Sequence, residues 1–290
     1  MLVKLIEEDF EKYIDFAYSL SQDQTKSGYP TYTDGIKTKK DFVETECKAF
    51  MDKRDEILLF EYEGKVEGWI HYFYIEEERY IEVCTCNINK MTGMALKEFM
   101  EYIQQRFKGY EMDLGFPKCN TDAISFLEKN GFECVEESCS NVFSFDQYKI
   151  LPESGDIVKV NEENYPEFRK IHSRYDGEMY WNSDRIYADL DRWNIYLCYA
   201  KGHLAGAVYY MDTEIMLEIF RVDFMDGIYD DEIFRALLLK VLNEGKKAGA
   251  KHLTFFSKDG QKIMSDLGFR CVGEYVCYRK ELKKDVNVFV

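Results

Sequence analysis

One segment of the chain carries residue types that suit the binding of an anion. The stretch NINKMTGMALKEF, residues 87–99, joins a strand-like apolar run directly to an amphipathic helix. A helix that opens from a strand exposes unpaired backbone N–H groups and the positive end of the helix dipole. Lys90 adds a positive charge, Thr92 adds a hydroxyl, and Gly93 allows the backbone to approach a ligand closely. The sequence therefore predicts a site for a phosphate-bearing ligand here.

The second half of the chain carries a related segment with the opposite charge. This segment is GIYDDEIFRALLL, in which Asp231 aligns with Gly93 (231 − 93 = 138) and lies between Asp230 and Glu232. Acidic side chains at a helix start accept hydrogen bonds from the free N–H groups and repel phosphate. We therefore expect the second half to lack the anion site and to be structural or to help bind a substrate.

The cysteines and histidines have no spacing typical of a metal site. Cys84 and Cys86 form a C-x-C pair on one face of a strand, without a second ligand pair at zinc-like spacing. No histidine belongs to an H-E-x-x-H motif. We expect both cysteines to be small buried side chains, and no metal.

These segments belong to two copies of one domain. A glycine turn at Gly64 recurs at Gly202, and LEKNGFECV recurs as MSDLGFRCV 137 residues later. Each copy is expected to hold a short strand, helices, three strands, an amphipathic helix, a strand, a second helix and a closing hairpin. The predicted domains are residues 1–150 and 156–290, joined near KILPESGD.

The first copy contains about 17 extra residues before its glycine turn (155 − 138), within SQDQTKSGYPTYTDGIKTKK. This insertion is either a lid over a substrate or a solvated loop.

Composition narrows the classes of partner. A net charge of −16 disfavours nucleic acids and anionic membranes, and it suits either a cationic partner such as an amine or simple solubility. No apolar run approaches the roughly 18 residues of a membrane helix. The acidic start of the chain does not resemble a signal peptide, and nine scattered cysteines suggest reduced thiols. We expect a cytoplasmic protein, either monomer or homodimer.

The stretch CNTDAISFLEKNGFE resembles the pattern N-x-x-A-I-x-x-Y-E-K-x-G-F of the GNAT superfamily of N-acetyltransferases. The matching residues are Asn120, Ala123, Ile124, Glu128, Lys129, Gly131 and Phe132. Residues 83–93 fall where the family has its third-strand valine and its Q/R-x-x-G-x-G/A loop, although Ile88 and Met91 depart from that loop. The resemblance implies an α/β (α+β) fold of two tandem GNAT-like domains. Each would be a mixed, mostly antiparallel twisted sheet flanked by helices.

The resemblance further implies acetyl transfer from acetyl-CoA, bound by the first domain, to a small-molecule or peptide amine. Glu82 would be the base, with Glu218 as its counterpart in the second copy, in a cleft between the third and fifth strands. The family's tyrosine acid is replaced by Leu127 and Met264. Expected cofactor-binding residues are Val83, Cys84, Thr85, Lys90, Met91, Thr92, Gly93, Met94 and Asn120. Expected acceptor-binding residues are Tyr29, Tyr32, Trp69 and His71.

Two alternatives stay open from the sequence. Because a loop glycine and the tyrosine acid are replaced, both copies could be catalytically degenerate, which would make the protein a binding or regulatory module that keeps the fold. A Fem-like aminoacyl transferase with tRNA as donor is disfavoured by the charge of −16.

Overall fold

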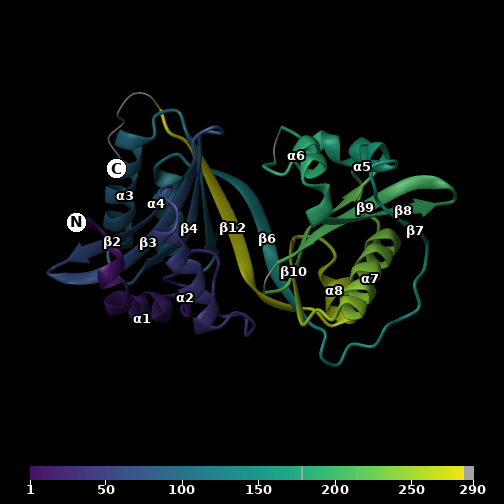
Figure 1. Cartoon of the computed structure of the whole chain (residues 1–290), viewed down its shortest axis with the longest axis horizontal. Helices are drawn as coiled ribbons and strands as arrows, with labels where there is room; N and C mark the ends of the chain where they lie inside the picture. The colour runs from purple at the N-terminus through teal and green to yellow at the C-terminus, as the bar shows by residue number, and fades with distance from the viewer. Residues whose placement is uncertain (178, 214, 284–290) are drawn as a thin grey trace. The chain divides into compact units, whose positions relative to one another are not determined.

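The computed structural model describes residues 1–177, 179–213 and 215–283. The chain forms two compact units (Figure 1). Unit 1 consists of Met1–Ser138 together with Gly273–Val290, and unit 2 consists of Cys139–Val272.

Unit 1 is a sheet covered by helices on both faces. Its strand order is β1-β2-β3-β4-β5-β12, and among these strands only β4 and β5 pair in parallel. Its strands are β1 (Leu2–Lys4), β2 (Asp55–Tyr62), β3 (Lys65–Ile75), β4 (Tyr80–Ile88), β5 (Glu111–Pro117) and β12 (Arg270–Glu281). Its helices are η1 (Glu7–Asp9), α1 (Phe10–Ser21), α2 (Lys39–Cys47), η2 (Lys48–Phe50), α3 (Thr92–Arg106) and α4 (Thr121–Lys129).

The apolar run in β2 explains why both faces are covered. Side chains alternate along a strand, so Leu58 and Phe60 pack in the core formed with α3 and α4. Ile57 and Leu59 pack in the opposite core, with α1 and α2. A strand that is apolar at successive positions must be covered on both faces, and here a layer of helices covers each face.

Unit 2 repeats this arrangement. Its strand order is β6-β11-β10-β9-β8-β7, and β10 and β11 form the parallel pair. Its strands are β6 (Glu133–Ser144), β7 (Asp156–Lys159), β8 (Trp193–Ala200), β9 (His203–Asp212), β10 (Leu217–Phe224) and β11 (His252–Ser257). Its helices are α5 (Tyr165–His172), η3 (Ser173–Tyr175), α6 (Ser183–Ala188), η4 (Leu190–Arg192), α7 (Asp231–Ala248) and α8 (Gln261–Leu267). The predicted tandem α/β fold, with mixed and mostly antiparallel strands flanked by helices in each unit, is confirmed.

The closing strands of the two repeats are exchanged. β12, at the end of the second repeat, pairs with β5 of unit 1 from Tyr275 to Glu281. β6, at the end of the first repeat, pairs with β11 of unit 2 through residues 139–144. The predicted domains were contiguous, but the contacts place residues 139–150 in unit 2 and residues 273–283 in unit 1.

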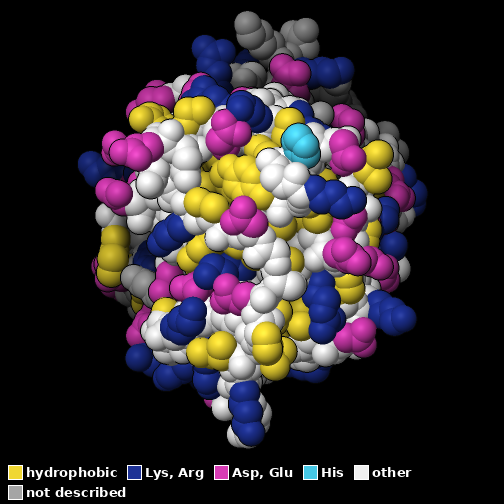
Figure 2. Space-filling view, turned by 90° about the vertical axis from the view of Figure 1, so that its right-hand side faces the viewer, with side chains coloured by type: hydrophobic (Ala, Val, Ile, Leu, Met, Phe, Trp, Pro, Cys, Tyr) yellow, Lys and Arg dark blue, Asp and Glu magenta, His cyan; other side chains and the backbone are white. Residues whose placement is uncertain are grey.

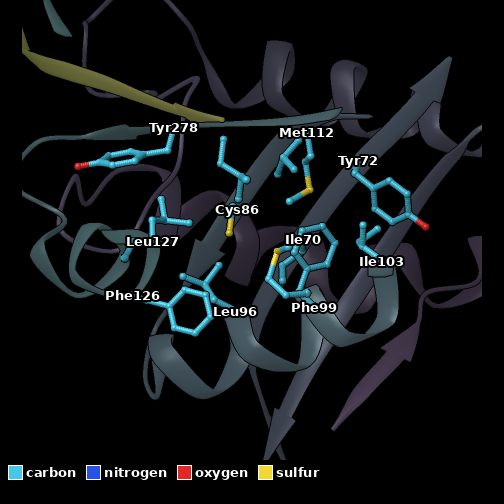
Figure 3. Close-up of a cluster of buried hydrophobic side chains, with 14 of the residues drawn as sticks. Ile70, Tyr72, Cys86, Leu96, Phe99, Ile103, Met112, Phe126, Leu127 and Tyr278 are labelled. Atoms are coloured by element: carbon cyan, nitrogen blue, oxygen red, sulfur yellow. The ribbon is translucent and has the colours of Figure 1, made fainter. Parts of the chain in front are cut away.

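β12 also contributes to the core of unit 1. Tyr278 is buried in the cluster that includes Leu127 of α4 and Cys86 of β4 (Figure 3). The Tyr278 hydroxyl donates to Glu128 Oε1 at 3.1 Å. Unit 1 therefore needs a segment that lies more than 130 residues beyond the rest of its chain (273 − 138 = 135).

The surface in Figure 2 intersperses acidic and basic side chains between hydrophobic ones. The net charge of −16 is thus not gathered as a single acidic field on that face. No helix within the described residues combines the length and the apolar character needed to cross a membrane.

A buried carboxylate of β2 makes unit 1 sensitive to acid. Glu56 accepts hydrogen bonds from Tyr72 and Arg106, both at 2.6 Å, and from Lys4 at 3.0 Å. Burial alone would raise the pKa of Glu56, but these donors outweigh it and lower that pKa to about 2. A lowered folded-state pKa stabilises the fold above the unfolded value of about 4.5, and this contribution disappears as pH falls toward 2.

We expect Glu56→Gln to lower the free energy of unfolding at pH 7 by up to about 3 kcal/mol and to flatten its pH dependence between pH 4.5 and 2. Urea unfolding across that range checks this, with Glu101→Gln on the surface of α3 as control. An equally steep acid dependence in Glu56→Gln would contradict it.

Candidate active site

The pairing of β4 with β5 ends early in unit 1. Only Tyr80–Glu82 pairs with Glu111–Asp113, although both strands continue further. Two residues beyond the last pair, β4 has a β-bulge at Cys84, between Val83 opposite Tyr72 and Thr85 opposite His71. A bulge leaves one residue without a ladder partner. Beyond it, β4 and β5 are no longer bonded to each other, and a slot opens between them.

Unit 2 has the same arrangement. β10 and β11 pair only from Leu217 to Ile219, and the bulge follows at Phe220. Glu218, like Glu82, lies two residues before the bulge, but it belongs to the middle pair of its ladder whereas Glu82 belongs to the last pair. Among the described residues, no main-chain hydrogen bond joins residues 221–223 to a segment other than β9.

In unit 1 the chain itself fills the slot. Lys26–Tyr29, which we call the plug, belongs to the insertion of the first copy. Ile88 N donates to Lys26 O at 2.8 Å, and Gly28 N donates to Cys86 O at 2.7 Å. On the other side, Tyr29 N donates to Gly115 O at 2.9 Å. The plug thus bonds to both strands like an added strand.

The plug fits the slot closely. Ser27 is fully buried, and its carbonyl accepts a hydrogen bond from Asn120 Nδ2 at 3.1 Å. A Cβ at Gly28 would lie 3.2 Å from three atoms of Cys86, two of them main-chain. The Tyr29 ring packs edge-on against Tyr275, with ring centroids 4.6 Å apart. The main-chain approach at Gly28 therefore depends on the absence of a side chain.

The predicted anion site lies at the start of α3. The N-cap residue Met91 has left-handed backbone (φ 59°, ψ 39°), and no side chain caps the helix. A Cβ on Gly93 would meet only Phe126, at 3.9 Å. Met94 is exposed and Thr92 is half-buried. A shallow pocket beside this helix start is lined by Gly93, Asp122, Ser125, Phe126, Lys129 and Asn130.

Lys90, the positive charge predicted for this site, already has an ionic partner. Lys90 is exposed, and its Nζ lies 3.7 Å from Glu67 Oε1. Glu67 is buried and also accepts a hydrogen bond from Asn89 Nδ2 at 2.6 Å, so it keeps one partner when Lys90 turns toward an anion.

The corresponding helix of unit 2 is closed by its own acid. The Asp230 side chain accepts hydrogen bonds from Glu232 N at 2.9 Å and Ile233 N at 3.0 Å. The capping residue is Asp230, the neighbour of the aligned Asp231. This carboxylate occupies the N–H groups that a phosphate would need.

Two residues predicted to bind an acceptor converge on an acid of α2. Glu46 is buried and accepts from Trp69 Nε1 at 2.7 Å and from Thr85 Oγ1 at 2.6 Å. His71 lies between two carboxylates: its Nδ1 is 3.1 Å from Glu46 Oε2, and its Nε2 is 3.3 Å from Asp55 Oδ1. The Nδ1 contact is close enough for an ion pair but is not aligned as a hydrogen bond. Burial lowers the pKa of His71, and the two carboxylates outweigh it and raise that pKa to about 9.

The remaining predicted residues are spread over unit 1. Glu82 is exposed on β4. The pKa of the Cys84 thiol is raised mainly by the burial of that thiol and, to a smaller extent, by the negative charge of Glu82. Tyr32 is buried against Phe42 and Tyr18. Asn120 caps α4 through its side-chain oxygen, which accepts from Ala123 N, in addition to holding the plug.

Sequence reasoning missed Glu46 and Asp55. Glu46 follows Phe42 by four residues, so both lie on the buried face of α2. An acid on the apolar face of a helix is a signal that the sequence did contain. Asp55 begins β2 and carries no comparable signal.

No protein-family profile and no curated protein matches the sequence. Solved structures do match its fold. A GCN5-related N-acetyltransferase from Sphaerobacter thermophilus superposes with a TM-score of 0.65 at 14% identity, over 99% of this chain and 97% of that one. A tandem GNAT protein from the clavulanic acid biosynthesis pathway has a TM-score of 0.56 at 12% identity, over 99% of both chains.

A third match covers only part of a larger protein. The GCN5-related glucosamine N-acetyltransferase region of a fungal multi-domain GH3 β-N-acetylglucosaminidase has a TM-score of 0.61 at 8% identity, over 97% of this chain and 38% of that one. At such identities the likeness establishes the fold. The chain has the tandem fold of the GNAT N-acetyltransferases.

Proposed function

We propose that the protein is an N-acetyltransferase that transfers acetyl from acetyl-CoA to a small-molecule or peptide amine, with the donor site in unit 1. The observation that carries this proposal is the uncapped start of α3 beside the bulged strand β4. The free N–H groups, the open position of Gly93 and the neighbouring pocket suit the phosphates of coenzyme A. At the corresponding position of unit 2 the start of α7 is capped by Asp230.

The residues fit only one end of acetyl-CoA. The phosphates fit at α3, whereas the slot between β4 and β5, which the thioester-bearing arm must enter to reach Val83, Cys84 and Thr85, holds the plug. The arm and the plug cannot occupy the slot together. Acetyl transfer in unit 1 therefore requires the plug to leave.

On the acceptor side we assign proton uptake to Glu82. Its exposed carboxylate lies on β4 two residues before the bulge and is reachable by an amine from solvent. A carboxylate can accept the proton that an amine must lose, directly or through one water. Trp69 and His71 lie deeper, against Glu46, so their role toward an acceptor is to position it.

Calorimetric titration with acetyl-CoA tests the donor site. We expect weak, saturable one-to-one binding to the wild type, because the phosphate end fits and the slot is filled. Gly93→Glu should abolish it, since a carboxylate at the helix start repels phosphate. Gly177→Glu, which adds the same charge in open space on unit 2, should bind like the wild type. Unchanged binding in Gly93→Glu would place the site elsewhere.

A second candidate is a catalytically degenerate module that binds or regulates through the GNAT fold. The filled slot of unit 1 and the capped helix of unit 2 favour it, because each unit lacks one half of a donor site. The two candidates differ in what happens when the plug is displaced.

A further inference from the structure

We propose that Asp55, His71 and Cys84 form a binding site for a divalent transition-metal ion, with Zn²⁺ as the best match. A ring nitrogen of His71, a carboxylate oxygen of Asp55 and the Cys84 sulfur all lie within 4.8 Å of one another. The three residues come from β3, β2 and β4, neighbouring strands of unit 1. The site shares His71 with the proposed acceptor side, but metal binding by these three residues does not depend on acetyl transfer.

The geometry already suits metal coordination at two of the three ligands. His71 Nε2 lies 3.3 Å from Asp55 Oδ1. Two ligands at tetrahedral angles, each about 2.1 Å from a zinc ion, are about 3.4 Å apart. The Cys84 sulfur is within reach of the same point by side-chain rotation, and the bulge at Cys84 frees this residue from the regular ladder.

Glu46 supplies the second shell that such a site needs. Its Oε2 lies 3.1 Å from His71 Nδ1, the ring nitrogen that faces away from Asp55. Trp69 and Thr85 fix the carboxylate by donating to its two oxygens. A carboxylate that accepts a hydrogen bond from a histidine ligand orients the ring. It keeps the proton on the nitrogen that does not bind the metal, which is Nδ1 in His71. A small rotation of the His71 ring would turn the present ion pair into that hydrogen bond.

The charges around the cluster also favour a cation. Glu46 and Asp55 contribute two negative charges, of which a proton on His71 can balance one. On binding Zn²⁺, the Cys84 thiol and His71 Nε2 each release one proton to solvent. The ion is then neutralised by the Asp55 carboxylate and the Cys84 thiolate, and Glu46 remains paired with the N–H at His71 Nδ1. The Cys84 sulfur adds nothing to an ion pair between histidine and carboxylate, but thiolate is among the strongest zinc ligands.

Access and coordination number point to an open site. The Asp55 side chain is about one-fifth exposed, so an ion can enter from this side, whereas His71 and Glu46 are buried. Three protein ligands leave a fourth position for water. The sequence concealed this arrangement because its C-x-C pair is not the ligand pair: Cys86 packs in the core formed with α3 and α4.

Cobalt binding to the full-length, chelator-treated and reduced protein tests the proposal. Co²⁺ replaces Zn²⁺ in such sites and reports a thiolate ligand by a sulfur-to-metal charge-transfer band. We expect one equivalent to bind with that band and to be displaced by Zn²⁺. Cys84→Ser should remove the band, and Asp55→Asn should weaken binding at least about tenfold. Cys86→Ser, two residues along the same strand, should leave the spectrum unchanged.

Thermal unfolding provides a second readout. A metal that binds only the folded state raises the unfolding temperature, so Zn²⁺ should stabilise the wild type and not Cys84→Ser. Two outcomes would overturn the proposal. One is the absence of saturable Co²⁺ binding by the wild type, and the other is an identical charge-transfer band in Cys84→Ser, which would assign the metal to exposed thiols such as Cys119, Cys134 or Cys271.

Discussion

A chain that ends at Val272 is expected to lose the fold of unit 1 and to keep that of unit 2. The truncation removes the part of β12 that pairs with β5 from Tyr275 to Glu281. It also removes Val276, Tyr278 and Leu282 from the core of unit 1. Burial of a large apolar side chain contributes about 1.5–3 kcal/mol, so the loss approaches the whole stability of a typical domain.

The location of the unfolding distinguishes strand exchange from contiguous domains. Limited proteolysis with mass spectrometry should show cleavage within residues 1–138 and protection of residues 139–272. Thermal unfolding followed by circular dichroism should show the transition of unit 2 without the signal change that comes from unit 1 in the wild type. A synthetic peptide of residues 273–283, added in excess, should restore protection. If the first repeat stays protected and the second is cleaved, the closing strands are not exchanged.

The sequence predicted the two copies because the same apolar stripes and glycine turns occur twice. It could not predict the exchange, because similarity between LEKNGFECV and MSDLGFRCV shows that the closing strands are alike and not which sheet receives each. A strand pairs through main-chain groups that every residue carries. Two equivalent closing strands therefore suit either sheet, and the connections decide.

The candidate site shows the same limit. Lys90 and Gly93 were predicted because a helix that follows a strand is visible in the sequence, as is the acid that closes α7. The cluster of Glu46, Asp55 and His71 was found only in part, because its members come from a helix and separate strands. Because these residues are far apart in the sequence, they form no recognisable motif.

The insertion was predicted as a lid or a loop, and its position in the slot was not foreseen. The contacts that seat Lys26–Tyr29 are main-chain hydrogen bonds, which leave no trace in residue types. Gly28 alone records the close approach. Because glycine is common in loops wherever the chain turns, its presence does not by itself indicate a close contact with another strand.

Displacing the plug is expected to increase the affinity of unit 1 for acetyl-CoA by at least about tenfold. Three main-chain hydrogen bonds hold the plug to β4 and β5. At about 0.5–1.5 kcal/mol each, they bias the slot toward its closed state by roughly 2–4 kcal/mol. A ligand that needs the open state binds more weakly by the fraction of molecules that are open, so removing this bias raises the apparent affinity.

Gly28→Val and Gly28→Pro are designed to displace the plug, because Gly28 is where its main chain approaches Cys86 most closely. A side chain at this position meets main-chain atoms of Cys86 at 3.2 Å, and proline also removes the N–H that donates to Cys86 O. Thr25→Val, in the same loop with its hydroxyl bonded to Asp23, is the matched control and should bind like the wild type. Titration with acetyl-CoA and thermal unfolding should be measured on all three.

The result distinguishes an acetyltransferase from a degenerate binding module, because the two differ in whether displacing the plug opens a site for acetyl-CoA. A folded Gly28 variant with tighter binding, lost again when Gly93→Glu is added, means that unit 1 is a donor site regulated by its own insertion. A folded Gly28 variant that binds no acetyl-CoA at millimolar concentration means that Lys26–Tyr29 has replaced the donor permanently. In that case β4 and β5 hold a structural strand, and the activity of the ancestral fold has been lost from unit 1.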